Sequence, residues 1–160
     1  LNNLRKGITI EQVEKVFGYT KKLWIKTLAD FMIGSPGETK NDIEDTIRFA
    51  KKLRANYVQF SLTTPFPGTD LYREALLKGI IKSDVWKDYA ENPKSDFTPP
   101  LWTENISKEE LLNLLSIAYK TFYLSTHFVY QELSAIRSFA DLSKKVNAGL
   151  KLLKKHCTYK

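Results

Sequence analysis

Two short apolar segments with a helical segment between them form the clearest pattern in the chain. Residues 28–33 are an apolar run broken once by an aspartate, and residues 56–62 alternate between apolar and polar side chains. Between them, apolar residues recur at helical spacing, behind a threonine at position 39 that can cap the helix. This order predicts a parallel β-α-β unit with a right-handed crossover. The apolar positions of its helix and second strand are Ile43, Ile47, Ala50, Val58, Phe60 and Leu62.

The period of two assigns a face to each side chain of the predicted strands. Helices cover the outside of such a unit, so the apolar residues of the second strand are expected to face them. Gln59 and Ser61 then point to the opposite face, and Asp30 of the first strand joins them. A buried polar group without a partner costs about 1–3 kcal/mol. We therefore expect these three side chains to line a polar, water-accessible pocket.

The segments that flank this unit show helix start signals. Thr9 and Gln12 form a possible capping box for a helix that precedes the first strand. Residues 1–7 resemble the end of an earlier helix, because a glycine closes them. After the second strand, Thr69 or Asp70 can cap a further short helix.

The second half of the chain divides into an irregular segment and a helical one. Residues 80–102 are rich in aromatic residues and proline but show no sustained period, so we expect an irregular segment that packs on the core or covers a substrate. From Ser107 onward, capping residues and apolar periodicity predict successive helices. The predicted organisation is an α/β part at 1–79, an irregular covering segment at 80–106 and a helical extension at 107–160.

Composition narrows the class of protein. The 160 residues are 42% apolar and 12% aromatic, which indicates a folded domain. No signal pattern and no apolar run of membrane length occur, so we expect a soluble, cytoplasmic protein. With one cysteine, Cys157, and two histidines, the chain has no disulfide framework and no cysteine- or histidine-rich metal site of its own. The formal charge of +7 is compatible with an anionic partner or with a lysine-rich surface. Because the sequence contains no arginine cluster, we do not expect that partner to be a nucleic acid.

Four short motifs in the first half of the chain occur together and in order. They are Arg5–Thr9, Phe31–Thr39, Gln59–Ser61 and Thr64–Tyr72. With these motifs the chain resembles the C-terminal half of radical SAM proteins. The nearest group is the cobalamin-binding one, which includes anaerobic magnesium-protoporphyrin IX monomethyl ester cyclases and hopanoid-modifying enzymes. The resemblance implies an α/β fold: the C-terminal part of a partial (β/α)6 radical SAM barrel, with an α-helical C-terminal extension.

The resemblance also implies a cofactor set and binding residues. Complete members bind S-adenosylmethionine on a four-iron, four-sulfur cluster and form a 5′-deoxyadenosyl radical, and the nearest group also uses cobalamin. The resemblance places residues 28–33 and 56–62 as the fifth and sixth strands of the barrel. In such barrels the adenosine end of the cofactor is held by the turn that follows the fifth strand, together with the sixth strand. The residues that match these positions are Ile33, Gly34, Pro36, Gly37, Glu38, Phe60 and Ser61. The candidates for the lumen and the substrate are Asp30, Gln59, Thr63 and Thr64.

A simpler interpretation of the same turn stays open. Gly34 and Gly37 can serve only the sharp strand-to-helix turn, and Glu38 can simply favour the N-terminus of the following helix. If Phe60 binds the cofactor, it does so through its backbone, because its ring is expected to face the helices.

The sequence departs from the family at one decisive point, because it contains no CxxxCxxC motif for the cluster. We therefore expect a fragment of a radical SAM oxidoreductase or methyltransferase, with no catalytic residue, no metal ligand and no cofactor in this chain alone. Its expected partner is a missing N-terminal half from the same or a neighbouring gene, or a second copy that covers the open edge of the first strand. The alternatives are a non-catalytic remnant or binding module, and a relative of tRNA methylthiotransferases, which typically end in a small β-domain where this chain is helical.

Overall fold

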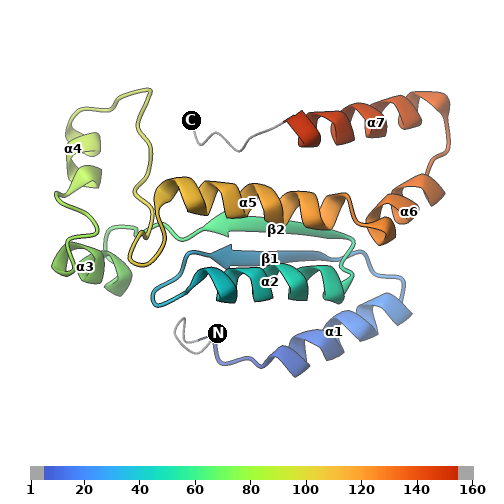
Figure 1. The fold of residues 1–160 in the computed structure, drawn as a ribbon, viewed down its shortest axis with the longest axis horizontal. Helices are drawn as coiled ribbons and strands as arrows, with labels where there is room; N and C mark the ends of the chain where they lie inside the picture. Colours follow the sequence, from blue (N-terminus) through green and yellow to red (C-terminus); the bar gives the residue numbers. More distant parts are fainter. Residues whose placement is uncertain (1–5, 155–160) are drawn as a thin grey trace.

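The computed structural model describes residues 6–154, and the side chains of residues 6–151. Most of the helix end predicted at 1–7 lies outside these residues, as does Cys157. The fold is of the α/β class, as the sequence predicted (Figure 1). In order, the elements are α1 (Ile10–Lys22), β1 (Leu28–Ile33), α2 (Lys40–Leu53), β2 (Tyr57–Leu62), α3 (Asp70–Leu77), α4 (Val85–Glu91), α5 (Lys108–Tyr123), α6 (Thr126–Ser134) and α7 (Phe139–Lys154).

The predicted β-α-β unit is confirmed. Strands β1 and β2 pair in parallel, with Leu28 opposite Tyr57 at one end and Ile33 opposite Leu62 at the other. Between them, α2 begins with a complete capping box, in which the Thr39 side chain accepts from the Asp42 N–H and the Asp42 side chain accepts from the Thr39 N–H.

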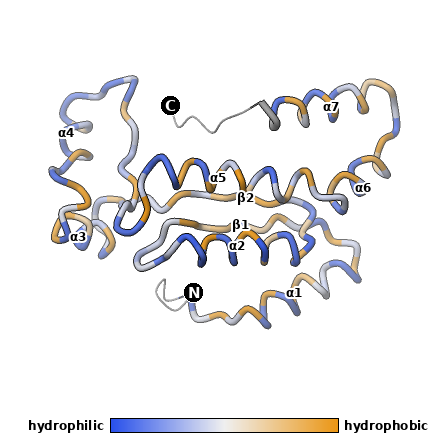
Figure 2. Tube along the Cα trace, viewed as in Figure 1, coloured by the Kyte–Doolittle hydropathy of each residue, from blue (hydrophilic) through white to orange (hydrophobic). Residues whose placement is uncertain are grey.

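One face of the two-stranded sheet is buried under helices and the other is open. Both α2 and α5 pack on the same face, and in Figure 2 the strands are mainly hydrophobic in colour while α2 alternates. On the opposite face Asp30 and Gln59 are exposed and Ser61 is half-buried. The predicted assignment of faces is therefore confirmed, whereas the barrel lumen itself stays a prediction. The buried strand residues are Ala29, Ile33, Val58, Phe60 and Leu62.

The helical extension also follows the sequence pattern closely. Helix α5 is capped by Ser107, whose side chain accepts from the Glu110 N–H at 3.1 Å, and the apolar stripe of the helix is buried. A break follows α5, and Ser125 caps α6. The Ser138 hydroxyl accepts from the Asp141 N–H at the start of α7. Within the described residues, none of the helices is both long and apolar enough to cross a membrane.

The segment predicted to be irregular contains a helix, and this part of the prediction is wrong. Asp84 caps the seven-residue helix α4 by accepting from the Lys87 N–H. Two turns are too short to show a helical period in the sequence, which is why the helix was missed. The indole N–H of Trp86, on α4, donates to the Pro65 carbonyl at 3.0 Å and so ties the segment to the turn after β2. Trp86 also packs against Phe66 at a ring distance of 5.1 Å.

Two tyrosines of α5 close the outer edge of β2. The Tyr123 hydroxyl accepts from the Val58 N–H at 3.3 Å and donates to the Val58 carbonyl at 2.7 Å. The Tyr119 hydroxyl makes the same pair of bonds to Phe60, at 3.1 and 3.0 Å. A parallel strand directs the backbone groups of alternate residues to opposite sides, so these are the groups that point away from β1. The tyrosines thus stand where a further strand would pair.

The spacing of the two tyrosines explains why a helix can do this. Four residues of helix rise about 6.0 Å, and two residues of strand rise about 6.6 Å. Tyrosines four apart therefore match strand residues two apart to within a fraction of an ångström. Unpaired strand edges promote association between chains, so this arrangement also shields β2 from pairing with another molecule.

The double substitution Tyr119→Phe and Tyr123→Phe should destabilise the fold. It removes four hydrogen bonds while it keeps both rings, and each net bond contributes about 0.5–1.5 kcal/mol. We expect a loss of about 2–4 kcal/mol in the free energy of unfolding, measured by urea titration, because the freed backbone groups regain some solvent contact. The control is Tyr130→Phe, at a side chain 74% exposed, which should change the free energy by less than about 0.5 kcal/mol. Equal effects of the two variants would show that the edge bonds contribute nothing.

Candidate functional site

The carboxyl ends of β1 and β2 meet at one side of the sheet, where α3 and α4 also lie (Figure 1). The Thr63 N–H donates to the Ile33 carbonyl at 3.0 Å, which extends the pairing by one residue. Beyond it, the hydroxyls of Ser35 and Thr63 are hydrogen-bonded at 3.2 Å, and both side chains are buried. The two strand ends, which are 28 residues apart in sequence, are therefore held together by their own polar groups.

The turn after β1 is closed by the side chain of Glu38. Its carboxylate accepts from the Ser35 N–H at 2.7 Å, and its own N–H donates to the Ser35 carbonyl at 3.0 Å. Gly34 and Gly37 adopt φ angles of +75° and +74°, which other residues rarely adopt. Burial raises the pKa of Glu38 above its ordinary value, with a smaller contribution from the Asp42 charge, although the bonds from the Ser35 and Gly34 N–H groups oppose the shift.

A second carboxylate, Glu104, connects this turn to the segment before α5. It accepts from the Gly37 N–H and from the Trp102 indole N–H, both at 3.1 Å. Its other oxygen lies 2.5 Å from the Lys78 ammonium, which is the main reason that the pKa of Glu104 lies below its usual value. The Asn105 side chain donates to the Glu38 carbonyl at 3.2 Å. Residues 102–105 therefore cover part of the carboxyl end of the sheet.

Four of the residues predicted to bind a cofactor or substrate are buried in the chain's own core. Ile33 and Phe60 face the helices, at 0% and 4% exposure. Thr63 is engaged with Ser35 and with the Ile33 carbonyl. Gly34 is buried against α5, and a Cβ on it would lie 2.9 Å from the Leu111 Cδ2 atom. Of these four residues, only Gly34 belongs to the simpler interpretation of the glycine turn, and its positive φ angle and close packing are compatible with that interpretation.

The other predicted residues lie where solvent reaches them. Gly37, Asp30 and Gln59 are exposed, and four more are half-buried. Asp30 lies opposite Gln59 in the strand register, so these two polar residues are neighbours on the open face. Asp30 and Gln59, together with Thr64 after β2, form what we call the polar strip. The strip lies on the same sheet as the Gly34–Glu38 turn. The half-buried residues of the predicted set are Pro36, Glu38, Ser61 and Thr64.

Sequence reasoning missed the residues that reach this turn from far along the chain. Lys78, Trp102, Glu104 and Asn105 all contact it or each other, and Glu104 is separated from Gly37 by 67 positions. No local pattern marks a side chain that acts over such a separation. Within the part of the chain that the structure describes, no three His, Cys, Asp or Glu side chains gather as metal ligands would.

Known proteins resemble this chain in sequence. An uncharacterized methyltransferase of Pyrococcus horikoshii is 33% identical over 94% of this chain, and the match covers 31% of that protein. An anaerobic magnesium-protoporphyrin IX monomethyl ester cyclase of Rubrivivax gelatinosus is 25% identical over 81% of this chain and 22% of its own length. A tRNA-2-methylthio-N(6)-dimethylallyladenosine synthase of Buchnera aphidicola is 28% identical over 76% of this chain and 37% of its own length.

Other comparisons give no match. No family model matches the chain, and no solved structure does. The chain spans between about a fifth and two fifths of the length of the three relatives described above.

Substitution of Gly34 by alanine should destabilise the fold more than the same change at Gly79. Both glycines have a positive φ, of +75° and +69°, so both substitutions strain the backbone. Only Gly34 would also place its Cβ against Leu111, because a Cβ on Gly79 meets nothing within 4 Å. We expect the additional loss at Gly34 to be about 1 kcal/mol or more, measured by urea unfolding. Equal losses would contradict the close packing of this turn on α5.

The raised pKa of Glu38 predicts a pH effect of definite sign. The folded chain holds this proton more tightly than the unfolded chain, so its contribution to stability falls as pH rises from 4.5, the ordinary value, through the raised pKa. Glu38→Gln should remove this fall while it keeps an oxygen for the Ser35 N–H. Unfolding free energies from pH 4 to 7 test this, and parallel curves for the two proteins would contradict it.

Proposed function

The chain resembles the C-terminal part of radical SAM proteins, and on that premise we propose that it completes the S-adenosylmethionine site of a radical SAM oxidoreductase or methyltransferase. The observation that carries the proposal is the position of the Gly34–Glu38 turn. It lies at the carboxyl end of a parallel strand, beside the end of the next strand, which is where α/β sheets and barrels bind their ligands.

The accessible residues of this edge have chemistry suited to a nucleoside. Glu38 and Ser61 can hydrogen-bond ribose hydroxyls, and the ring of Pro36 offers an apolar surface to adenine. Gly37 lets the backbone approach a ligand closely. Some residues that we predicted to contact the cofactor or substrate act indirectly in this proposal, because they only fix the shape of the turn. They are Ile33, Gly34, Phe60 and Thr63. A substrate would meet the polar strip formed by Asp30, Gln59 and Thr64.

The described residues fit the nucleoside end of the cofactor and not its iron–sulfur cluster. Three cysteine thiolates ordinarily hold such a cluster, and residues 6–151 contain no cysteine. We propose that the cluster, and any cobalamin, are held by a part of the enzyme outside this sequence, either in the same polypeptide or in a second one. S-adenosylmethionine bound to the cluster supplies the radical chemistry, and this chain binds and orients the adenosine.

Exposed apolar side chains near β1 suggest where that other part docks. On the open face of the sheet Leu28 is 56% exposed and Met32 is 44% exposed. Trp24, just before β1, is 94% exposed. We propose that these exposed apolar side chains contribute to a contact site. The proposed partner therefore approaches from β1, whereas the outer edge of β2 is closed by tyrosines.

Modification of tRNA is the second candidate function, and its support is the similarity to the Buchnera aphidicola synthase. It is the weaker candidate because the match to the Pyrococcus horikoshii methyltransferase has higher identity and covers more of this chain. A non-catalytic binding module is the remaining alternative, and the experiment below separates it from the enzyme.

Co-production with the polypeptide encoded directly upstream, or as one longer polypeptide if the frame is continuous, tests the proposal. After anaerobic reconstitution, the complex should bind S-adenosylmethionine and release 5′-deoxyadenosine on reduction. Glu38→Gln should weaken S-adenosylmethionine binding by about five- to tenfold. The variant keeps an acceptor oxygen, but it replaces a hydrogen bond to a charged group, of about 1.5–3 kcal/mol, by a neutral one of about 0.5–1.5 kcal/mol. Glu44→Gln, on α2 of the same unit, is the matched control and should leave binding unchanged.

Two outcomes would count against the enzyme. If the upstream sequence encodes no CxxxCxxC motif and the complex releases no 5′-deoxyadenosine, the chain is a binding module. If the complex is active but Glu38→Gln and Glu44→Gln bind equally well, the proposed contact with the Gly34–Glu38 turn is wrong.

A further inference from the structure

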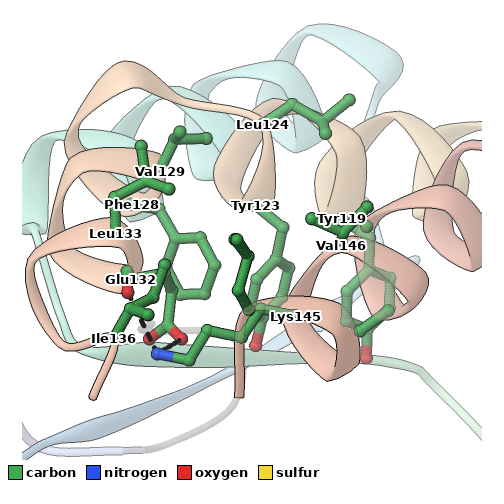
Figure 3. A pocket seen from close by; sticks show the side chains of 13 residues that line it. Tyr119, Tyr123, Leu124, Phe128, Val129, Glu132, Leu133, Ile136, Lys145 and Val146 are labelled. Atoms are coloured by element: carbon green, nitrogen blue, oxygen red, sulfur yellow. Dashed lines mark hydrogen bonds and ion pairs between the residues drawn. The ribbon is translucent and has the colours of Figure 1, made fainter. Parts of the chain in front are cut away.

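The three C-terminal helices line a cavity that is partly open to solvent, on the far side of α5 from α2. Its volume is about 520 Å³, which falls within the range typical of small-molecule sites, about 300–1,000 Å³. Aromatic rings from α5 and α6 form one wall, and the apolar face of α7 forms the other (Figure 3). Its main apolar residues are Tyr123, Phe128, Leu133, Ile136, Leu142 and Val146.

The polar groups of the wall are already paired with one another. The Lys145 ammonium lies 3.0 Å from the Glu132 carboxylate and also donates to the Glu132 carbonyl at 3.0 Å. Asp141 lies 4.0 Å from the same ammonium. The hydroxyls of Tyr119 and Tyr123 are bonded to the edge of β2, so only their rings face the cavity. An occupant therefore meets apolar surface and a neutralised ion pair.

The wall contains a glycine, Gly149 of α7. Within the part of the chain that the structure describes, a Cβ on Gly149 would meet no heavy atom within 4 Å. A glycine inside a helix costs about 1 kcal/mol relative to alanine, so α7 would be more stable with a side chain at this position. The glycine leaves open a volume that a ligand can use.

We propose that this cavity binds an uncharged, largely apolar small molecule, with one or two rings or a short aliphatic chain. The chemical class follows from the pairing of the wall. A charged ligand would lose its hydration without gaining a free counter-charge, because Lys145 and Glu132 already satisfy each other. The site is separate from the Gly34–Glu38 turn, and it does not depend on the function proposed above.

Two fluorescent probes that differ in one charge test the class of ligand. N-phenyl-1-naphthylamine is uncharged, and 8-anilino-1-naphthalenesulfonate has the same ring system with a sulfonate. The 160-residue chain should bind the uncharged probe saturably, with one site per chain. The sulfonate probe should bind at least about tenfold more weakly, because its charge would be buried without a partner. Tighter binding of the sulfonate would show that Lys145 is an anion anchor, and would overturn the proposed class.

A pair of glycine substitutions tests the place of binding. Gly149→Phe puts a ring into the cavity and should weaken binding of the uncharged probe by at least about tenfold, because the added volume takes the space of the ligand. Gly18→Phe is the matched control on α1, where a Cβ also meets nothing within 4 Å. It should leave binding unchanged. Both changes remove a helical glycine, and circular dichroism with thermal unfolding confirms that each variant is folded.

Three further results would contradict the proposed binding of an apolar molecule in this cavity. The proposal is wrong if no saturable binding occurs, or if both phenylalanine variants bind as the unchanged chain does. It is also wrong if probe binding disappears as the chain forms dimers in size-exclusion chromatography, because a second copy then fills the cavity. Gly149→Ala, which adds one methyl group, should retain binding within about threefold.

Discussion

The whole structure depends on the coverage of one face of a two-stranded parallel sheet. A pair of strands is at best marginally stable in water, and parallel sheets are rarely left open. Here α2 and α5 lie side by side on the same face and bury the apolar residues of both strands. Because α2 is the crossover between the strands and α5 arrives from the far half of the chain, neither half of the sequence builds this core alone.

The candidate binding edge is a consequence of that arrangement. Once α5 is packed on the sheet, residues 102–105 pass directly over the strand ends, and Glu104 bonds to Gly37. The same packing explains the closeness of Gly34 to Leu111. The turn that would meet a cofactor is therefore positioned both by its own Glu38 and by the segment that leads into α5. The open face carries Asp30 beside Gln59, together with the exposed apolar side chains of Leu28 and Met32.

Local pattern was sufficient to predict the strands, the capping residues and the two faces of the sheet. Alternation assigned Val58 and Phe60 correctly to the helix side, and Thr39 marked the start of α2. Three features could not be predicted from the local sequence pattern, each for a physical reason. Helix α4 is too short to show a period, the contacts of Glu104 join distant positions, and the cavity lies between helices whose packing no single helix specifies. The burial of Thr63 likewise depends on a hydroxyl partner, Ser35, in the turn after β1.

The tyrosine closure of β2 also bears on the way the molecule opens. The amide hydrogens of Val58 and Phe60 lie on an outer edge, yet each is held by a side chain of α5. They can exchange with solvent only when those tyrosines withdraw, and the rings of the tyrosines are packed among α5, α6 and the cavity wall. We therefore expect the edge of β2 and helix α5 to open together, as one cooperative unit. The backbone groups on the outer edge of β2 are in this way protected although no further strand pairs with them.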